Sequence, residues 1–194
     1  MFFKDIKLMT NLPEKTQNLL NNLKDKSLAT KVSNLKTKIA NMKKFSKNIL
    51  LCDVSGSMNT IVDYTDNVRA IDILNNVLES FQGAQIWEFS NGRNKANGRL
   101  TIKDSTNMTN AFNCMKANNF KEIILLTDGQ PDDPVSALKA AKNLKINIIY
   151  IGPKPTPKFL RDLANSTGGQ FENVELIMAG STKELENKIR GLLT

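Results

Sequence analysis

Short apolar runs alternate with amphipathic stretches from residue 47 to the C-terminus. Two of these runs are continuously apolar, which is typical of parallel strands that are buried on both faces. Because helical spacing of apolar residues separates the runs, the pattern predicts a doubly wound, mostly parallel α/β sheet with helices on both faces. The predicted strands are 49–52, 84–89, 123–126, 146–151 and 170–176.

The segments between these strands predict the helices and one further strand. Glycine and asparagine residues between 92 and 98 favour a hairpin turn, which predicts an antiparallel edge strand at 100–102. Helices are predicted from Val68 to Phe81, after Thr109, over 134–144, from Thr156 to Gly168 and from Ser181 onward.

Residues 13–45 follow a different pattern, with apolar residues every three or four positions and lysine on the other face. This spacing predicts an amphipathic helix, and the five-residue step from Leu23 to Leu28 indicates a bend within it. We therefore predict an N-terminal helical extension, 1–46, ahead of an α/β domain, 47–194. The helix either packs on its own domain or self-associates, and the pattern leaves both open.

The net charge of +8 belongs to this extension. Residues 1–47 contain eleven lysines and three acidic residues, whereas the rest of the chain contains sixteen basic and sixteen acidic residues. Such a charge favours an acidic partner or the surface of a partner protein. Nucleic acid is the less favoured partner, because the extension has no arginine and few aromatic residues that could stack on bases.

The composition excludes several classes of protein. Histidine is absent, which rules out Ser-His and Cys-His catalysis and histidine zinc sites. Cys52 and Cys114 are expected to be buried small residues, because no secretion signal or disulfide framework accompanies them. No apolar run reaches the roughly 18 residues of a membrane span. We expect a cytoplasmic protein, and the lysine- and asparagine-rich composition is typical of an AT-rich bacterial or phage genome.

Oxygen ligands are predicted to gather where two of the apolar strands end. Asp53 follows the predicted strand 49–52, and Asp128 lies just beyond the predicted strand 123–126. The carboxyl ends of parallel strands lie at one edge of a sheet. Ser55 and Ser57 follow Asp53 closely enough to turn their hydroxyls toward the same point. Two carboxylates with two hydroxyls make a hard, all-oxygen site that suits Mg²⁺ or Mn²⁺.

The motif at 53–58, Asp-Val-Ser-Gly-Ser-Met, resembles the D-x-S-G-S motif of von Willebrand factor A (VWA) domains. Thr127-Asp128-Gly129 resembles their second acidic loop, and the resemblance spans about 47–194. It implies a Rossmann-like VWA fold with an intact metal-ion-dependent adhesion site. The ligands it implies are Asp53, Ser55, Ser57, Thr109 and Asp128.

Thr109 is our choice for the threonine ligand, with Thr106 as the alternative. The glycine-rich lead that usually precedes this threonine in the family is missing, because residues 104–108 read Asp-Ser-Thr-Asn-Met. Asp132 and Asp133 are predicted to be helix N-caps rather than ligands, since Pro134 follows them. Trp87 is predicted to belong to the core.

The resemblance implies a non-enzymatic function. A Mg²⁺ ion, or Mn²⁺, bound at this site would accept a Glu or Asp side chain from a protein partner. Bacterial and phage proteins that resemble this one act in assembly systems or beside ring ATPases, in the host cytoplasm or in a virion.

Two other functions compete with this prediction. One is a structural subunit that oligomerises or docks through the N-terminal helix, with the metal loop incidental. The other is a Mg²⁺-dependent phosphoryl-transfer enzyme, which is disfavoured because Ser55 stands where a second Asp would be needed and no catalytic acid or base is apparent.

Overall fold

The computed structural model describes residues 30–33, 49–63, 66–81, 83–152, 155–175 and 181–193. By internal contacts the chain divides into two units, Met1–Lys43 and Lys44–Thr194. Of the helix predicted over 13–45, only 30–33 are described, and they are helical. The rest of that prediction lies outside the described residues. Within the described part, no helix is long and apolar enough to cross a membrane.

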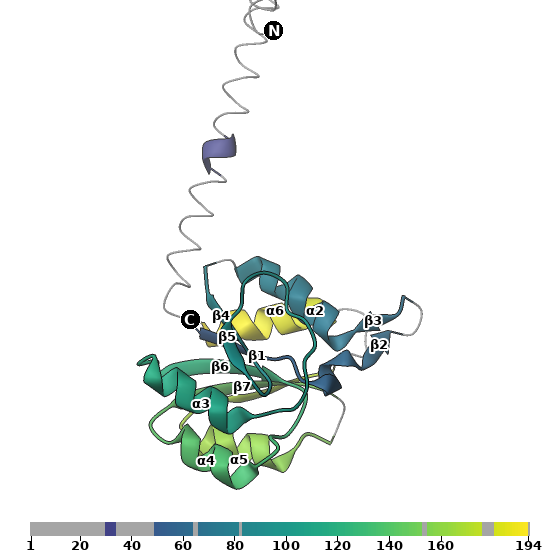
Figure 1. The fold of residues 1–194 in the computed structure, drawn as a ribbon. Helices are drawn as coiled ribbons and strands as arrows, with labels where there is room; N and C mark the ends of the chain where they lie inside the picture. Colours follow the sequence, from purple (N-terminus) through teal and green to yellow (C-terminus); the bar gives the residue numbers. More distant parts are fainter. Residues whose placement is uncertain are drawn as a thin grey trace, which may run out of the picture. The chain divides into compact units, whose positions relative to one another are not determined.

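One six-stranded sheet forms the centre of the second unit (Figure 1). Its order is β5-β4-β1-β6-β7-β8, and all neighbouring strands are parallel except β4 and β5. The predicted doubly wound, mostly parallel sheet with one antiparallel edge strand is therefore confirmed. The strands are β1 (Ile49–Asp53), β4 (Gln85–Phe89), β5 (Arg93–Lys95), β6 (Glu122–Thr127), β7 (Lys145–Ile151) and β8 (Phe171–Val174).

Helices cover both faces of this sheet (Figure 1). In the figure, α2 and α6 lie on one face, and α3, α4 and α5 lie on the other. Short 3-10 turns follow β1 and α2. The helical segments are η2 (Gly56–Asn59), α2 (Ala70–Leu78), η3 (Glu79–Phe81), α3 (Met108–Ala117), α4 (Pro134–Ala141), α5 (Lys158–Ser166) and α6 (Ser181–Leu192).

Two hydrophobic cores explain the apolar runs 49–52 in β1 and 123–126 in β6. Successive side chains of a strand point to opposite faces, so Leu50 and Cys52 pack in the core beneath α2 and α6. Ile49 and Leu51 pack in the other core, with Phe112 of α3. All of these β1 residues are at most 2% exposed, so each face of the strand needs an apolar partner.

The edge strand differs from the predicted one in position. It was expected at 100–102, but the antiparallel partner of β4 is β5, at Arg93–Lys95. The turn is tighter than predicted, because the Ser90 amide donates to the Gly92 carbonyl and the chain reverses at once. The residues expected to form the strand instead belong to an irregular segment that crosses the domain.

The start of the first helix was also predicted too early. Val68 belongs to β3 (Val68–Arg69), which pairs with β2 (Ile61–Asp63) in a small antiparallel hairpin. The helix α2 begins at Ala70, where the Arg69 amide donates to Asp72 in the first turn. Apolar spacing does not separate a strand residue from the first residue of the helix that follows it.

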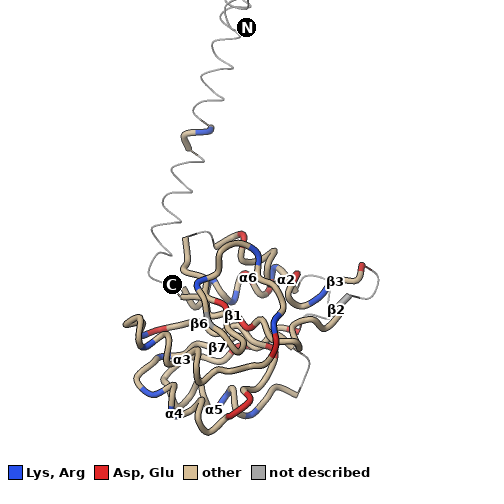
Figure 2. The backbone as a smooth tube through the Cα atoms, in the orientation of Figure 1, with Lys and Arg blue, Asp and Glu red and all other residues tan. Residues whose placement is uncertain are grey.

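Of the remaining core predictions, that for Cys52 is confirmed, whereas Cys114 and Trp87 are only partly buried against one core. Cys52 is fully buried, while Cys114 is partly buried. Trp87 packs at the margin of one core and meets Phe120 edge to face, with ring centroids 5.9 Å apart. Figure 2 shows basic and acidic residues interspersed along the described part of the α/β domain, in keeping with its balanced charge.

Candidate metal site

The two predicted carboxylate ligands lie at the point where the strand order of the sheet reverses. From β1 the chain moves outward to β4 and β5, then returns to the other side of β1 with β6. β1 and β6 pair in register up to Cys52 and Leu126. Asp53 is therefore the last residue of β1, and Asp128 follows directly after β6. Parallel α/β sheets bind ligands at this crevice, beyond the carboxyl ends of the strands.

A chain of hydrogen bonds joins four of the five predicted ligands. The Ser55 amide donates to Asp53 Oδ1 at 2.9 Å, which folds the first loop back over the strand end. The Ser55 and Ser57 hydroxyl oxygens lie 3.1 Å apart, and Ser57 Oγ donates to Asp128 Oδ1 at 2.7 Å. Side chains from two loops that are 71 residues apart thus meet at one edge of the sheet.

Thr127 is a member of this cluster to which sequence analysis assigned no role. Its hydroxyl is fully buried and donates to Asp53 Oδ2 at 2.6 Å. The same oxygen accepts a hydrogen bond from the Gly129 amide at 3.2 Å, so it also shapes the loop that carries Asp128. The signal was present in the Thr-Asp-Gly motif, but only the pairing of β1 with β6 shows that Thr127 faces Asp53.

The electrostatic state of the site reflects burial of two acids close together. Burial raises the pKa of Asp53, although hydrogen bonds from Thr127 and Ser55 oppose this rise, and the charge of Asp132 adds to it. Burial also raises the pKa of Asp128 to about 6; the hydrogen bond from Ser57 lowers it and the charge of Asp53 raises it further. No lysine or arginine of the described residues pairs with either carboxylate.

This donor set fits a hard divalent cation. Buried carboxylates are stable as anions only when a positive charge or several hydrogen-bond donors compensate them. Asp53, Asp128 and the two serine hydroxyls are all oxygen donors, and Mg²⁺ and Mn²⁺ prefer such ligands. Within the described residues there is no cluster of three or more His, Cys, Asp or Glu side chains, so any ion here depends on the hydroxyls as well.

The loop that contains Thr106 belongs to the irregular segment 96–107, which we call the strap. Near its end, the Thr106 amide donates to the Asp132 carboxylate at 3.2 Å, and the Asp132 amide donates to the Thr106 carbonyl at 3.2 Å. Thr106 is buried and Asp132 is exposed. This two-way clamp ties the strap to the loop that follows Asp128.

Asp132 was predicted to be a helix N-cap, and that prediction is wrong, because its carboxylate holds the strap. Asp133 is the N-cap of α4, as predicted: its side chain accepts the Ser136 amide at 3.0 Å. The two neighbouring aspartates therefore have separate tasks, which the local sequence Asp-Asp-Pro does not distinguish.

Thr109 lies in the first turn of α3, where Asn107 is the N-cap. It lines a surface hollow of about 250 Å³ together with Asp132, Asp133 and Ser136. It also lines a neighbouring hollow of about 310 Å³, between α3 and α4, with Lys116 and Lys139. The choice between Thr109 and Thr106 as a ligand stays a prediction, as does the ligand role of the other four residues.

Comparison with solved structures places this architecture among known folds. A von Willebrand factor type A protein from Catenulispora acidiphila superimposes with a TM-score of 0.56 at 19% identity, over 75% of this chain and 41% of that one. The fold is that of a VWA domain. At this identity the likeness concerns the fold alone, and this chain spans less than half the length of that relative.

The manganese-loaded TRAP protein of Plasmodium vivax shares the VWA-type fold with a TM-score of 0.52 and 18% identity, over 75% of this chain and 72% of that chain. No protein-family model matches the sequence, and no curated protein matches it significantly. The resemblance seen in the short motifs is therefore carried by the three-dimensional arrangement and not by overall sequence similarity.

Proposed function

We propose that this protein is a metal-dependent protein-interaction module and not an enzyme. The observation that carries the proposal is the hydrogen-bonded chain of Asp53, Ser55, Ser57 and Asp128 at the switch point of a VWA-type sheet. These residues, with Thr109 or Thr106, would hold Mg²⁺ or Mn²⁺. The TRAP protein of the same fold was solved with manganese, which supports a divalent ion at this edge.

The bound ion would supply a positive charge and an open coordination position to a partner. Ser57 is exposed and Asp128 partly exposed, whereas Asp53 and Ser55 are buried, so the site is open on one side only. A Glu or Asp side chain of the partner is the matching ligand, since hard cations favour carboxylate oxygens. Without the ion, the acidic residues at this edge would repel such a partner.

The test has two steps, both with the full chain. Calorimetric titration with Mg²⁺ and Mn²⁺ should show binding to the wild type and none to Asp53→Ala. Affinity capture should then retain a protein in Mg²⁺ that is released by EDTA and is not retained by Asp53→Ala. Absence of metal binding to the wild type would refute the proposal.

The competing role as a structural subunit makes a different prediction. If residues 1–46 assemble copies of the chain or dock into a larger complex, size-exclusion chromatography should show a change of mass when they are deleted. EDTA and Asp53→Ala should leave the mass of the full chain unchanged. That combination, with capture unaffected by metal, would favour the structural role.

A further inference from the structure

The strap 96–107 has no regular secondary structure, yet it carries Thr106, one of the two candidate threonine ligands, to the loop that follows Asp128. Its position therefore depends on separate side-chain and backbone contacts. Those contacts lie at its start, its middle and its end.

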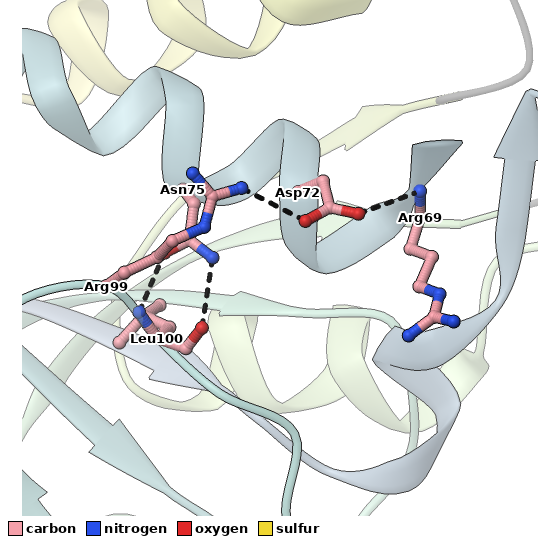
Figure 3. Close-up of polar contacts among 5 residues, drawn as sticks. All are labelled: Arg69, Asp72, Asn75, Arg99 and Leu100. Carbon is pink, nitrogen blue, oxygen red and sulfur yellow. Dashed lines mark hydrogen bonds and ion pairs between the residues drawn. The ribbon is translucent and has the colours of Figure 1, made fainter. Parts of the chain in front are cut away.

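At its start, the strap is tied to β4, where the Ala96 amide donates to the Ile86 carbonyl at 2.8 Å. A buried side chain of α2 holds it next, at Leu100. Asn75 Nδ2 donates to the Leu100 carbonyl at 3.0 Å, and the Leu100 amide donates to Asn75 Oδ1 at 2.8 Å (Figure 3). Asn75 is 6% exposed and Leu100 is 3% exposed. The amide group thus satisfies both backbone polar groups of Leu100 away from water, as a neighbouring strand would, and an unpaired buried polar group is destabilising.

An ion pair lies beside this contact at the surface. Arg99 Nη2 donates to Asp72 Oδ1 at 3.0 Å, and the other oxygen of Asp72 accepts the Arg69 amide at 3.3 Å (Figure 3). Both side chains of the ion pair are more than a third exposed, so solvent screens the interaction. Asn75 is therefore the stronger of the two anchors.

Three residues beyond Leu100, the strap meets the first metal loop directly. The Lys103 amide donates to the Val54 carbonyl at 2.6 Å, and Val54 lies between Asp53 and Ser55. The Lys103 ammonium also pairs with Glu88 on β4. The clamp of Asp132 on Thr106 follows three residues later.

We propose that Asn75 is a positioning residue for the metal site. Its amide fixes the strap at Leu100, and three residues later the strap holds the backbone of the first loop through the Val54 carbonyl. The inference rests on the proposed function, because it concerns the metal affinity of that site. Asn75 itself touches none of the predicted ligands through its hydrogen bonds, so it acts through the strap.

The test compares Asn75 with its neighbour Asn76, which is exposed on the same helix. The Mg²⁺ dissociation constant is measured calorimetrically on the full chain, well below the melting temperature, together with melting in EDTA. Asn75→Ala should weaken Mg²⁺ binding several-fold, less than the roughly tenfold or greater loss typical of a residue that bonds directly to a ligand, because Asn75 acts only through the strap. Asn76→Ala should leave it unchanged.

Asn75→Ser covers the case in which Asn75→Ala fails to fold. Its hydroxyl is neutral and can pair with at most one of the two Leu100 backbone groups, so a smaller loss of affinity is expected. Amide hydrogen exchange should quicken at Lys103 and Thr106 in either variant and stay unchanged in β6 and β7.

The outcomes separate the two proposals. A folded Asn75 variant with a lower melting temperature but the wild-type dissociation constant would overturn the inference and leave the proposed function intact. A wild type that binds neither Mg²⁺ nor Mn²⁺ would refute the proposed function, and the inference with it.

Discussion

Asp53 is the last residue of β1, and Asp128 directly follows β6, its parallel neighbour. Thr106, in contrast, lies near the end of the strap, which pairs with no strand of the sheet over most of its length. The strand ends are held by a ladder of backbone hydrogen bonds and by two hydrophobic cores. The strap is held by scattered contacts, among them the Asn75 and Asp132 side chains and the backbone carbonyls of Ile86, Val54 and Ser90. The two carboxylates therefore share the stability of the sheet, whereas the position of Thr106 depends on a few separate hydrogen bonds.

This difference has a consequence for how each half responds to mutation. A strand of the sheet is held by many backbone hydrogen bonds, so a ligand side chain at the end of the strand can be removed with little movement of the backbone. A segment fixed by a few separate contacts can shift locally when one of them is lost, so residues far from the metal can alter its affinity. The following predictions test this contrast.

The largest effect is expected from Asp53→Asn, which removes a ligand charge but keeps the shape of the side chain. In the wild type, Mg²⁺ at ten times its dissociation constant should stabilise the fold by about 1.4 kcal/mol and raise the melting temperature by about 3 °C. The variant should show no rise. In EDTA it should be at least as stable as the wild type, because burial disfavours the Asp53 carboxylate.

Asp162→Asn is the matched control, since Asp162 is exposed on α5. It should keep the full response to Mg²⁺. Severe destabilisation of Asp53→Asn in EDTA would mean that Asp53 is mainly a structural cap of the first loop.

A pH dependence of the metal-free protein is expected from Asp128. Its pKa is about 6 in the folded chain against an ordinary value of 3.8, so the folded state binds more protons between these values. The contribution of Asp128 to the free energy of unfolding should therefore be fully present below pH 4 and be lost as the pH rises through 6. Urea denaturation in EDTA at several pH values measures this slope, and Asp128→Asn should reduce it. A slope that is the same in both proteins would contradict the prediction.

Replacing the threonine ligand should weaken metal binding less than replacing Asp53 does, and this effect should show which of the two threonines is the ligand. The threonine that binds would supply one neutral ligand, which water can replace, so a several-fold weaker affinity is expected and not a complete loss. We expect this loss for Thr106→Val, because the Asp132 clamp ties Thr106 to the loop of Asp128. Thr109→Val is the matched comparison by Mg²⁺ titration, and a larger effect there would assign the ligand to Thr109.

The smallest effect is expected from Asp133→Ala, which removes the N-cap of α4. The lost hydrogen bond to Ser136 should lower the free energy of unfolding by about 1 kcal/mol in chemical denaturation. Metal affinity should not change.

Asp132→Ala should show the reverse pattern, with weaker metal binding from release of the strap. Equal effects of the two variants on Mg²⁺ affinity would argue against separate roles for these neighbours.

Much of this protein was predictable from sequence because parallel strands have a strong local signature. Runs such as 49–52 and 123–126 must be buried on both faces, so they indicated the sheet and the edge at which Asp53 and Asp128 meet. The α4 cap at Asp133 was likewise local, since the carboxylate bonds to an amide three residues away.

The tertiary structure alone decided where the remaining residues act. Thr127 faces Asp53 through strand pairing, Asp132 holds Thr106 across 26 residues, and Asn75 holds Leu100 across 25. The edge strand at 93–95 and the irregular course of 100–102 follow from the same kind of contact. Hydrogen bonds between segments distant in sequence leave no periodicity in the chain, because a single polar side chain suffices. For Asn75 and Asp132, moreover, the partner is a backbone group that any residue could supply.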